Sequence, residues 1–191
     1  MKILIVDNNS IYLDCLKKLF IQHDLVIQNP SELDESESNK HDLIVLSGGH
    51  GMSVYGNEEY FKNEINLVKT STAPIIGICL GMEIILVAYN QNLQNNKVNI
   101  KGEDLLKISE EYKIFEGLDP TKLSIYENHK WYVGSVTEDL HVLARCKHCI
   151  QIVKASNKNI YGLQFHPEVL IENSEESKII DNILFQISSI K

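Results

Sequence analysis

Residues 75–83 read Ile-Ile-Gly-Ile-Cys-Leu-Gly-Met-Glu, and this stretch decides the fold. Its apolar beginning predicts a buried strand, and the Gly-x-Cys-x-Gly segment at 77–81 predicts a tight turn that leads directly into a helix. A side chain at Gly77 or Gly81 would crowd the neighbouring strand or helix. Cys79 then lies at a helix N-terminus, where the positive end of the helix dipole favours a thiolate.

A second stretch, residues 161–169, reads Tyr-Gly-Leu-Gln-Phe-His-Pro-Glu-Val. His166 and Glu168 are two residues apart, and in an extended segment both side chains face the same side. Pro167 fixes one backbone torsion and favours extended geometry before it. A histidine oriented by a carboxylate is the partner that a cysteine nucleophile needs. Either stretch alone also fits a packed cysteine or a surface turn, but together they predict a Cys79–His166–Glu168 triad.

The composition is that of an ordinary globular chain. Its 191 residues are expected to form a single domain over 1–191, long enough to bury a sizeable core. The hydrophobic fraction of 43% and the charged fraction of 23% are typical of such domains. A net charge of -8 argues against nucleic acid as a partner, because phosphate binding requires clustered Lys and Arg.

The sequence predicts a cytoplasmic protein that does not enter a membrane. The apolar run at 3–6 is too short for a signal peptide, and no stretch approaches the roughly 20 apolar residues of a transmembrane helix. The four cysteines do not form the pattern of a secreted disulfide framework; they are Cys15, Cys79, Cys146 and Cys149. A reducing compartment also suits a working thiolate.

Cys146 and Cys149 form a Cys-x-x-Cys motif, for which zinc binding and redox chemistry must be considered. Zinc would require a second pair of ligands, and the sequence places none for it. A thioredoxin-type motif would lie between a strand and a helix, whereas this one leads into the strand-like residues 150–153. We therefore expect an incidental pair in a strand turn, and neither a metal nor a cofactor.

The first half of the chain alternates predicted strands and helices. The predicted strands lie at 2–7, 25–28, 42–46 and 74–78; the predicted helices lie at 11–20, from Asn57 through 68, and after Cys79. Residues 30–40 are polar and acidic and are expected to form a loop. This βαβ alternation predicts an α/β fold with a mostly parallel sheet and helices on both faces.

The second half is rich in short β-like segments, which predict hairpins and an antiparallel extension of the sheet. These segments lie at 97–100, 105–108, 112–115, 123–126, 131–136, 140–145, 149–154 and 159–165. Near the end, Asn173 with Glu176 resembles a capping box. The apolar stripe that follows, from Ile179 to Ile190, predicts a closing helix.

The segments at 77–81 and 162–168 together resemble the class I, triad-type glutamine amidotransferases. A third block, Leu-Ser-Gly-Gly-His-Gly at 46–51, stands before the turn, where that family carries its glycine loop. No Lys-Ser or Lys-Thr follows Gly51, so the loop does not match a phosphate-binding P-loop. The resemblance covers nearly the whole chain and implies a flavodoxin-like fold and hydrolysis of glutamine without a cofactor.

The resemblance also implies roles for individual residues. Cys79 would attack the side-chain amide of glutamine, and backbone N–H groups of Gly49 and Leu80 would stabilise the oxyanion. The residues implied in substrate binding are Gly48, His50, Gly51, Glu83, Asn128, His129 and Lys130. In the family, ammonia passes to an ATP-dependent synthetase. These 191 residues contain no synthetase domain, so a separate synthetase subunit is the expected partner.

Within the family, four segments are similar to the free-standing glutaminase subunits of GMP synthases; they lie at 114–118, 127–129, 143–149 and 160–169. Three departures put the acceptor and the amide substrate in question. Residues 128–131 read Asn-His-Lys-Trp in place of Ser-His-x-Asp, His50 replaces a proline, and Glu83 replaces a glutamine. An ionised Glu83 only accepts hydrogen bonds, so it would favour the α-ammonium of the substrate over the α-carboxylate.

The sequence leaves three functions open. The chain is an amidotransferase subunit that supplies ammonia, a stand-alone γ-glutamyl hydrolase with the same triad, or a non-catalytic protein with a relic site. The complete triad argues against the third. Trp131 fits both an interface anchor and a partly buried core residue. The ammonia acceptor cannot be named from these residues.

Overall fold

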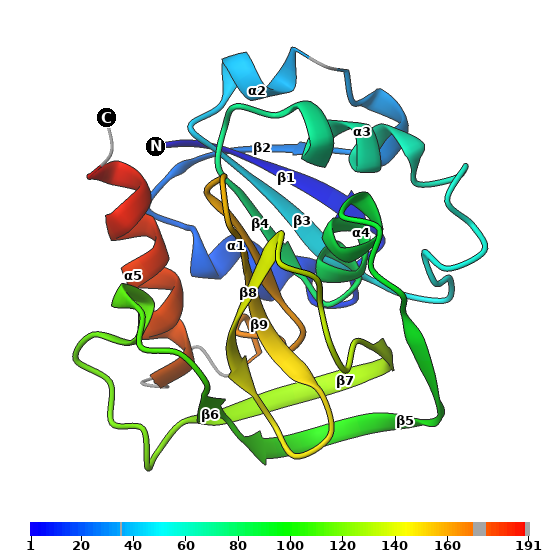
Figure 1. Cartoon of the computed structure of the whole chain (residues 1–191). Coiled ribbons are helices and arrows are strands. Elements are labelled where there is room, and N and C mark those ends of the chain that lie inside the picture. Colours follow the sequence, from blue (N-terminus) through cyan, green and yellow to red (C-terminus); the bar gives the residue numbers. More distant parts are fainter. Residues whose placement is uncertain (35, 170–174, 190–191) are drawn as a thin grey trace.

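A mixed eight-stranded sheet forms the centre of the molecule (Figure 1). The computed structural model describes residues 1–34, 36–169 and 175–189. The strand order is β2-β1-β3-β4-β10-β9-β8-β6. The strands are β1 (Lys2–Asn8), β2 (Asp24–Gln28), β3 (Leu43–Gly49), β4 (Ile75–Ile78), β6 (Lys107–Ile108), β8 (Leu140–Arg145), β9 (Ile150–Ala155) and β10 (Ile160–Leu163).

The pairing confirms the mostly parallel sheet with an antiparallel extension. β2, β1, β3, β4 and β10 pair in parallel, so their carboxyl ends meet at one edge. β9, β8 and β6 continue the sheet with antiparallel pairing. The parallel strands at the centre of the sheet are apolar along most of their length because both faces are covered.

Helices cover both faces of the sheet, as the sequence predicts. α1 (Leu13–Leu19) and α5 (Glu175–Ser188) pack on one face with Ile3 and Ile5 of β1. α3 (Lys62–Thr70) and α4 (Leu80–Ala88) pack on the other face with Leu4 and Val6 of β1. Successive side chains of a strand point to opposite faces, so β1 contributes alternately to the two cores.

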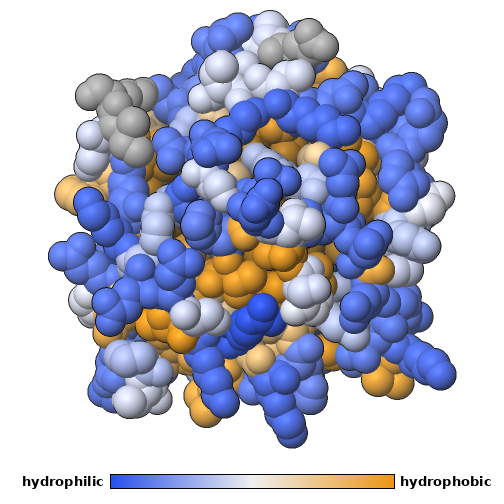
Figure 2. All heavy atoms as spheres, viewed as in Figure 1, coloured by the Kyte–Doolittle hydropathy of each residue, from blue (hydrophilic) through white to orange (hydrophobic). Residues whose placement is uncertain are grey.

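A separate two-stranded antiparallel ribbon lies beside the sheet and is formed by β5 (Gln94–Leu105) and β7 (Ser124–Tyr132). Along β7 every second side chain from Ile125 to His129 is buried, whereas β5 is largely exposed. On the face shown in Figure 2, hydrophilic atoms form the rim and apolar atoms gather in a central hollow.

Several local predictions are wrong. Residues 112–115 form a 3-10 turn at Lys113–Phe115 instead of a strand, and the expected loop at 30–40 contains a 3-10 turn (Pro30–Glu32) and a short helix α2 (Glu37–Lys40). The predicted strand at 97–100 is confirmed as part of the longer β5, whereas only residues 131 and 132 of the predicted strand at 131–136 belong to β7. The strand bounds differ from the predicted ones because a β segment becomes a strand only where a neighbouring strand in space can pair with it.

The helix starts also differ from expectation. α3 begins at Lys62 rather than after Asn57, whose carbonyl accepts a turn hydrogen bond from Tyr60 N–H. α1 begins at Leu13, and Ile11 is 65% exposed rather than part of its apolar stripe. Asn173 of the expected capping box lies outside the described residues. Within the described parts of the chain, no helix has the length and apolar character needed to cross a membrane.

The turn between β4 and α4 has the strained geometry that the glycine pattern predicts. Cys79 has φ +51°, a backbone conformation that is uncommon for a residue with a side chain. A Cβ atom at Gly77 would lie 2.4 Å from the carbonyl oxygen of Gly81, and one at Gly81 would lie 2.2 Å from that of Leu46. Only glycine at these two positions lets α4 approach β3 and β4 this closely.

Gly81→Ala is expected to destabilise the fold by about 2 kcal/mol or more, because its new methyl group would meet the rigid backbone of β3. Chemical denaturation followed by circular dichroism measures the effect. Gly134→Ala is the matched control. Its Cβ would be no closer than 3.8 Å to the Gln94 side chain, so its unfolding free energy should stay within about 0.5 kcal/mol of wild type. Equal stability of the two variants would contradict this account of the turn.

Candidate active site

The structure brings Cys79, His166 and Glu168 together at the carboxyl edge of the parallel strands. Cys79 follows β4 and is 5% exposed, and its backbone N–H donates to Leu163 O at 2.7 Å. This bond ties the turn to β10, the strand that leads to His166. His166 Nδ1 lies 2.8 Å from Glu168 Oε1, and both side chains are buried.

His166 and Glu168 do not lie on a strand, contrary to the sequence-based expectation. β10 ends at Leu163, and Pro167 and Glu168 belong to a turn. The turn brings the carboxylate back to the imidazole, and the His166 backbone N–H is fixed by Tyr126 O at 2.9 Å. The two side chains therefore meet through a turn rather than through the alternation of an extended segment.

The environment of His166 favours its protonated form. Burial by itself lowers the pKa of an imidazole. The Cys79 sulfur and the Glu168 carboxylate, each in hydrogen-bond contact with the ring, outweigh burial and raise the pKa of His166 above its usual range.

The absence of a side chain at Gly48 leaves room for the His166 imidazole beside Cys79. A Cβ atom at Gly48 would lie 3.0 Å from His166 Cε1 and 3.7 Å from Cys79 Cβ. Any larger residue at this position would displace the ring. The sequence indicated Gly48 as a substrate contact, whereas the structure places it beside the His166 ring.

Gly49 and Leu80 are adjacent in space although they are 31 residues apart in the chain. A Cβ atom at Gly49 would lie 2.1 Å from Leu80 Cδ2, so no larger residue fits there. Leu80 is the first residue of α4, and the first backbone N–H groups of a helix have no acceptor within it. The two residues predicted as oxyanion donors are therefore neighbours in the folded chain.

A cavity of about 590 Å³ opens over Cys79 and His166. Of the residues expected to bind substrate, those that line it are His50, Gly51, Glu83, Asn128, His129 and Lys130. The carbonyl oxygen of Asn128 lies 3.9 Å from Cys79 Sγ. The His129 ring, although it borders the cavity, is buried, and its two nitrogens lie 3.0 Å from Trp131 O and 3.3 Å from Glu127 Oε1.

Glu83 has a different charge state from the one its sequence position implied. It is 4% exposed, and burial raises its pKa to about 8, although a hydrogen bond from the Val54 backbone N–H lowers the pKa in part. Glu83 is therefore mainly protonated at neutral pH, and its Oε2 has no hydrogen-bond partner among the described residues. A protonated carboxyl both donates and accepts hydrogen bonds, as the family's glutamine does.

The cavity-wall residues that the sequence analysis missed include Tyr12, Asn99 and Lys101. The Tyr12 ring stands edge-on to the His166 ring, with centroids 4.9 Å apart. Its hydroxyl accepts a hydrogen bond from Asn128 Nδ2 at 3.1 Å. No local pattern marks these residues, because they come from the β1–α1 loop and from β5.

Trp131 is partly buried and stacks on Tyr55, with ring centroids 5.4 Å apart and an interplanar angle of 30°. Tyr55 is 57% exposed and belongs to the segment that follows the glycine loop. The contact therefore holds that segment against the β7 ribbon at the rim of the cavity.

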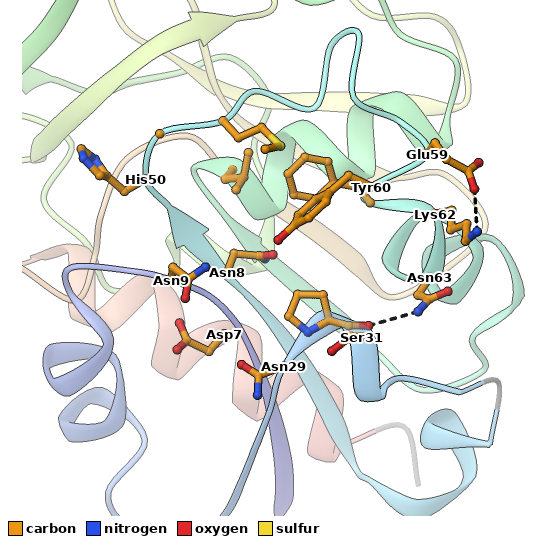
Figure 3. A pocket seen from close by; sticks show the side chains of 15 residues that line it. Asp7, Asn8, Asn9, Asn29, Ser31, His50, Glu59, Tyr60, Lys62 and Asn63 are labelled. Carbon is orange, nitrogen blue, oxygen red and sulfur yellow. Dashed lines mark hydrogen bonds and ion pairs between the residues drawn. The ribbon is translucent and has the colours of Figure 1, made fainter.

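A larger cavity of about 740 Å³ lies on the other side of the glycine loop (Figure 3). It is lined by neither Cys79 nor His166. His50, Gly51 and Leu80 border both cavities, so the glycine loop separates them. The cavity of about 590 Å³ is therefore the one bordered by the Cys79 thiol and the His166 imidazole.

The chain matches the family model "Glutamine amidotransferase class-I" over residues 4–187. The chain belongs to the class I glutamine amidotransferases. Among curated relatives, the glutamine-hydrolyzing GMP synthase subunit of Methanobrevibacter smithii is 30% identical over 88% of this chain and 87% of the relative. The corresponding subunit of Methanothermobacter thermautotrophicus is 33% identical over 87% of this chain and 88% of the relative.

Solved structures show the same fold. A candidate GMP synthase subunit of Thermoplasma acidophilum superposes with a TM-score of 0.85, at 24% identity, over 100% of this chain and 95% of that one. A glutamine amidotransferase of Thermotoga maritima superposes with a TM-score of 0.78, at 18% identity, over 98% of this chain and 97% of that one. The architecture predicted from the sequence is therefore confirmed for this amidotransferase.

Behind the glycine loop, a buried carboxyl holds β1 in place. Asn8 pairs with Gly49 in the sheet, and its side-chain amide donates to Glu64 Oε1 at 2.9 Å. Burial raises the pKa of Glu64 to about 7, although the bond from Asn8 lowers it in part. The folded amidotransferase thus retains a proton that the unfolded chain releases near pH 4.5.

The unfolding free energy is therefore expected to fall as pH rises from about 4.5 to about 7, by up to about 1.4 kcal/mol per pH unit from this group. Glu64→Gln keeps an acceptor for Asn8 and should flatten that part of the profile. Urea unfolding across this pH range measures it, with the exposed Glu111→Gln as control. If Glu64→Gln and wild type give parallel profiles, Glu64 does not carry a proton in the folded state.

Proposed function

We propose that this chain hydrolyses glutamine to glutamate and ammonia through a Cys79–His166–Glu168 triad and delivers the ammonia to a separate synthetase subunit. The observation that carries the proposal is a cysteine at a strained strand–helix turn, in contact with an imidazole whose Nδ1 lies 2.8 Å from a buried carboxylate. Membership in the class I amidotransferases and the names of the curated relatives support the same reaction.

The triad would act in two stages. Cys79 attacks the side-chain carbonyl carbon of glutamine as a thiolate, and protonated His166 gives its proton to the departing ammonia. A glutamyl thioester stays on Cys79. His166 then takes a proton from water, which attacks the thioester and releases glutamate. Glu168 keeps the imidazole oriented and stabilises its charge throughout.

The oxyanion would be held by the backbone N–H groups of Gly49 and Leu80. Gly49 ends β3 and Leu80 begins α4, so both are fixed by the central sheet and its helix. Such preorganised donors stabilise the charge without reorganising during the reaction. The close contact between these two residues supports a pair of donors aimed at one position.

The amino-acid end of glutamine would lie against the cavity wall formed by α4 and the ribbon. Lys101 and Lys130 supply positive charge that suits an α-carboxylate. Protonated Glu83 adds a donor there instead of the repulsive charge that its sequence position implied. Free glutamine is therefore compatible with this wall at neutral pH, and Gly51, His50 and Asn128 complete it.

The partner in this proposal is an ATP-dependent synthetase subunit of the GMP synthase type. The curated relatives are named as glutamine-hydrolyzing subunits of GMP synthase, and the matches span most of both chains. The Tyr55–Trp131 stack and exposed Lys130 lie at the cavity rim and form the candidate contact surface. Glu127 and His129 of the same strand are buried and do not belong to that surface. A cytoplasmic location belongs to the same proposal, since a thiolate nucleophile requires a reducing compartment.

Cys79→Ala is expected to reduce glutamine hydrolysis by about 10,000-fold or more, because the nucleophile is lost. A glutamate analogue that alkylates thiols should label Cys79 alone among the four cysteines. Mass spectrometry of the labelled chain and a glutaminase assay measure the two effects. His166→Ala should lose about 100-fold or more, and Glu168→Ala should lose less.

Cys15→Ser is the matched control, since Cys15 is a half-buried free thiol on α1 and should leave turnover unchanged. Labelling that persists in Cys79→Ala would exclude Cys79 as the nucleophile. Turnover that rises with a synthetase subunit supports the amidotransferase, whereas a preference for γ-glutamyl peptides without any partner supports a stand-alone hydrolase.

Glu83→Gln is expected to leave the Michaelis constant for glutamine within about threefold of wild type at pH 7, because both side chains donate and accept there. Above about pH 8 the wild-type constant should rise as Glu83 ionises, and the variant should lack this rise. Initial rates measured from about pH 6 to about pH 9 test both statements. Identical pH profiles for the two proteins would remove Glu83 from the substrate-binding wall.

A further inference from the structure

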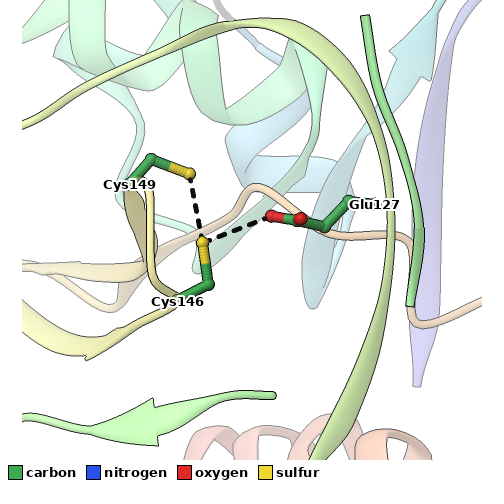
Figure 4. A group of neighbouring side chains, drawn as sticks. All are labelled: Glu127, Cys146 and Cys149. Carbon is green, nitrogen blue, oxygen red and sulfur yellow. Dashed lines mark hydrogen bonds between the residues drawn. The ribbon is translucent and has the colours of Figure 1, made fainter. Parts of the chain in front are cut away.

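A cluster of buried polar groups lies between β7 and the β8–β9 turn (Figure 4). It consists of the Cys146 and Cys149 thiols and the Glu127 carboxylate, whose ligand atoms all lie within 4.8 Å of one another. We refer to it as the thiol–carboxylate cluster. The two cysteines flank the β8–β9 turn, which is closed by the Cys146 N–H donating to Cys149 O at 3.0 Å.

The distances within the cluster match those of a tetrahedral zinc site. The two sulfurs are 3.7 Å apart, and Cys146 Sγ lies 3.5 Å from Glu127 Oε1. For zinc bonds of about 2.3 Å to sulfur and about 2.0 Å to oxygen, tetrahedral angles place two sulfurs about 3.8 Å apart and a sulfur and an oxygen about 3.5 Å apart. Two of the three spacings are thus those of a zinc site, and the third, between Cys149 and Glu127, is within 4.8 Å.

Several polar groups around the cluster converge on the Glu127 carboxylate. Glu127 is 2% exposed, and a buried carboxylate is costly unless a positive charge or several donors satisfy it. His129 Nδ1 lies 3.0 Å from the carbonyl oxygen of Trp131, which only accepts, so this nitrogen carries the ring proton. His129 Nε2 then faces Glu127 Oε1 at 3.3 Å.

Gln151 provides a fourth position. Its side-chain nitrogen lies 3.2 Å from each of the two sulfurs and donates to Glu127 as well. Its Oε1 is buried and has no hydrogen-bond partner in the described part of the chain. Rotating the amide by 180° exchanges the nitrogen for an oxygen of almost the same shape. The cluster would then present two sulfur and two oxygen ligands.

We propose that the thiol–carboxylate cluster binds a zinc ion, with both sulfurs and the Glu127 carboxylate as ligands and the Gln151 amide oxygen in the fourth position. Thiolate ligands in tetrahedral geometry select zinc over magnesium or calcium, which prefer oxygen alone. All four ligands come from the protein and are buried, so the site is structural rather than catalytic. The His148 backbone N–H, 3.4 Å from Cys146 Sγ, adds an outer donor to one thiolate.

The site lies one residue from the catalytic machinery proposed above, but it does not depend on that proposal. Glu127 precedes Asn128, whose carbonyl oxygen is 3.9 Å from Cys79 Sγ and whose amide holds Tyr12 over His166. A zinc ion would anchor β7 to the β8–β9 turn at this point. Metal content can be measured on a protein that does not hydrolyse glutamine.

The test therefore uses the Cys79→Ala chain, in which the active-site thiol cannot contribute a ligand. Titration of this metal-free chain with cobalt(II) alone should give one equivalent of bound cobalt. Its spectrum should show a thiolate-to-cobalt charge-transfer band and the intense visible bands of tetrahedral geometry. Zinc added afterwards should displace the cobalt and raise the melting temperature. Absence of these bands, or binding of cobalt without thiolate charge transfer, would overturn the proposal.

Matched variants locate the ligands. In the Cys79→Ala background, Cys146→Ser combined with Cys149→Ser should abolish the bands, whereas Cys15→Ser should leave them unchanged. If the double variant does not fold, Glu127→Gln keeps the size of the side chain and should weaken zinc binding at least about tenfold. Unchanged affinity in Glu127→Gln, or a pair of cysteines that oxidises to a disulfide and binds no zinc, would count against the site.

Discussion

The close approach of α4 to the sheet is the constraint on which the rest of the molecule depends. Gly77 and Gly81 leave no room for a side chain, and the short turn between them forces Cys79 into a left-handed conformation. The strain is maintained because the surrounding strands and helix are buried on both sides. The same turn presents the sulfur at a helix start and brings Leu80 beside Gly49. One packing contact thus positions the proposed nucleophile and the two residues proposed as oxyanion donors.

The carboxyl edge of the parallel strands determines which residues lie near the Cys79 sulfur. The parallel strands deliver the glycine loop, Cys79 and His166 to one edge because their carboxyl ends align there. The ribbon strand β7 closes the cavity from a different part of the chain. The backbone carbonyl of Asn128 lies 3.9 Å from the Cys79 sulfur, and the side chain of the preceding Glu127 accepts from Cys146. The proposed catalytic site and the proposed metal site are therefore built on consecutive residues of one strand.

Burial also changes the chemistry of individual carboxyl groups in this amidotransferase. Burial raises the pKa of Glu83 and of Glu176 to about 8 and that of Glu64 to about 7, so these side chains carry protons that exposed carboxyls would have released. For Glu83 the effect restores a hydrogen-bond donor at a position where the family has glutamine. A substitution that looks like a change of charge in the sequence is thus closer to a conservative replacement in the folded protein.

The sequence by itself determined the family, the α/β architecture and the strained turn, and it indicated the residues of the proposed triad, because glycine spacing and apolar runs report local backbone requirements. It misplaced the start of α3, took residues 112–115 for a strand and took the His166–Glu168 pair as extended, since strand pairing and turns depend on neighbours distant in the chain. Only the tertiary structure placed Tyr12 over His166, protonated Glu83 through burial, and brought Glu127 and Gln151 to the two cysteines. A Cys-x-x-Cys motif shows two ligands, but the remaining ones come from other positions on adjacent strands, and their proximity exists only once the chain has folded.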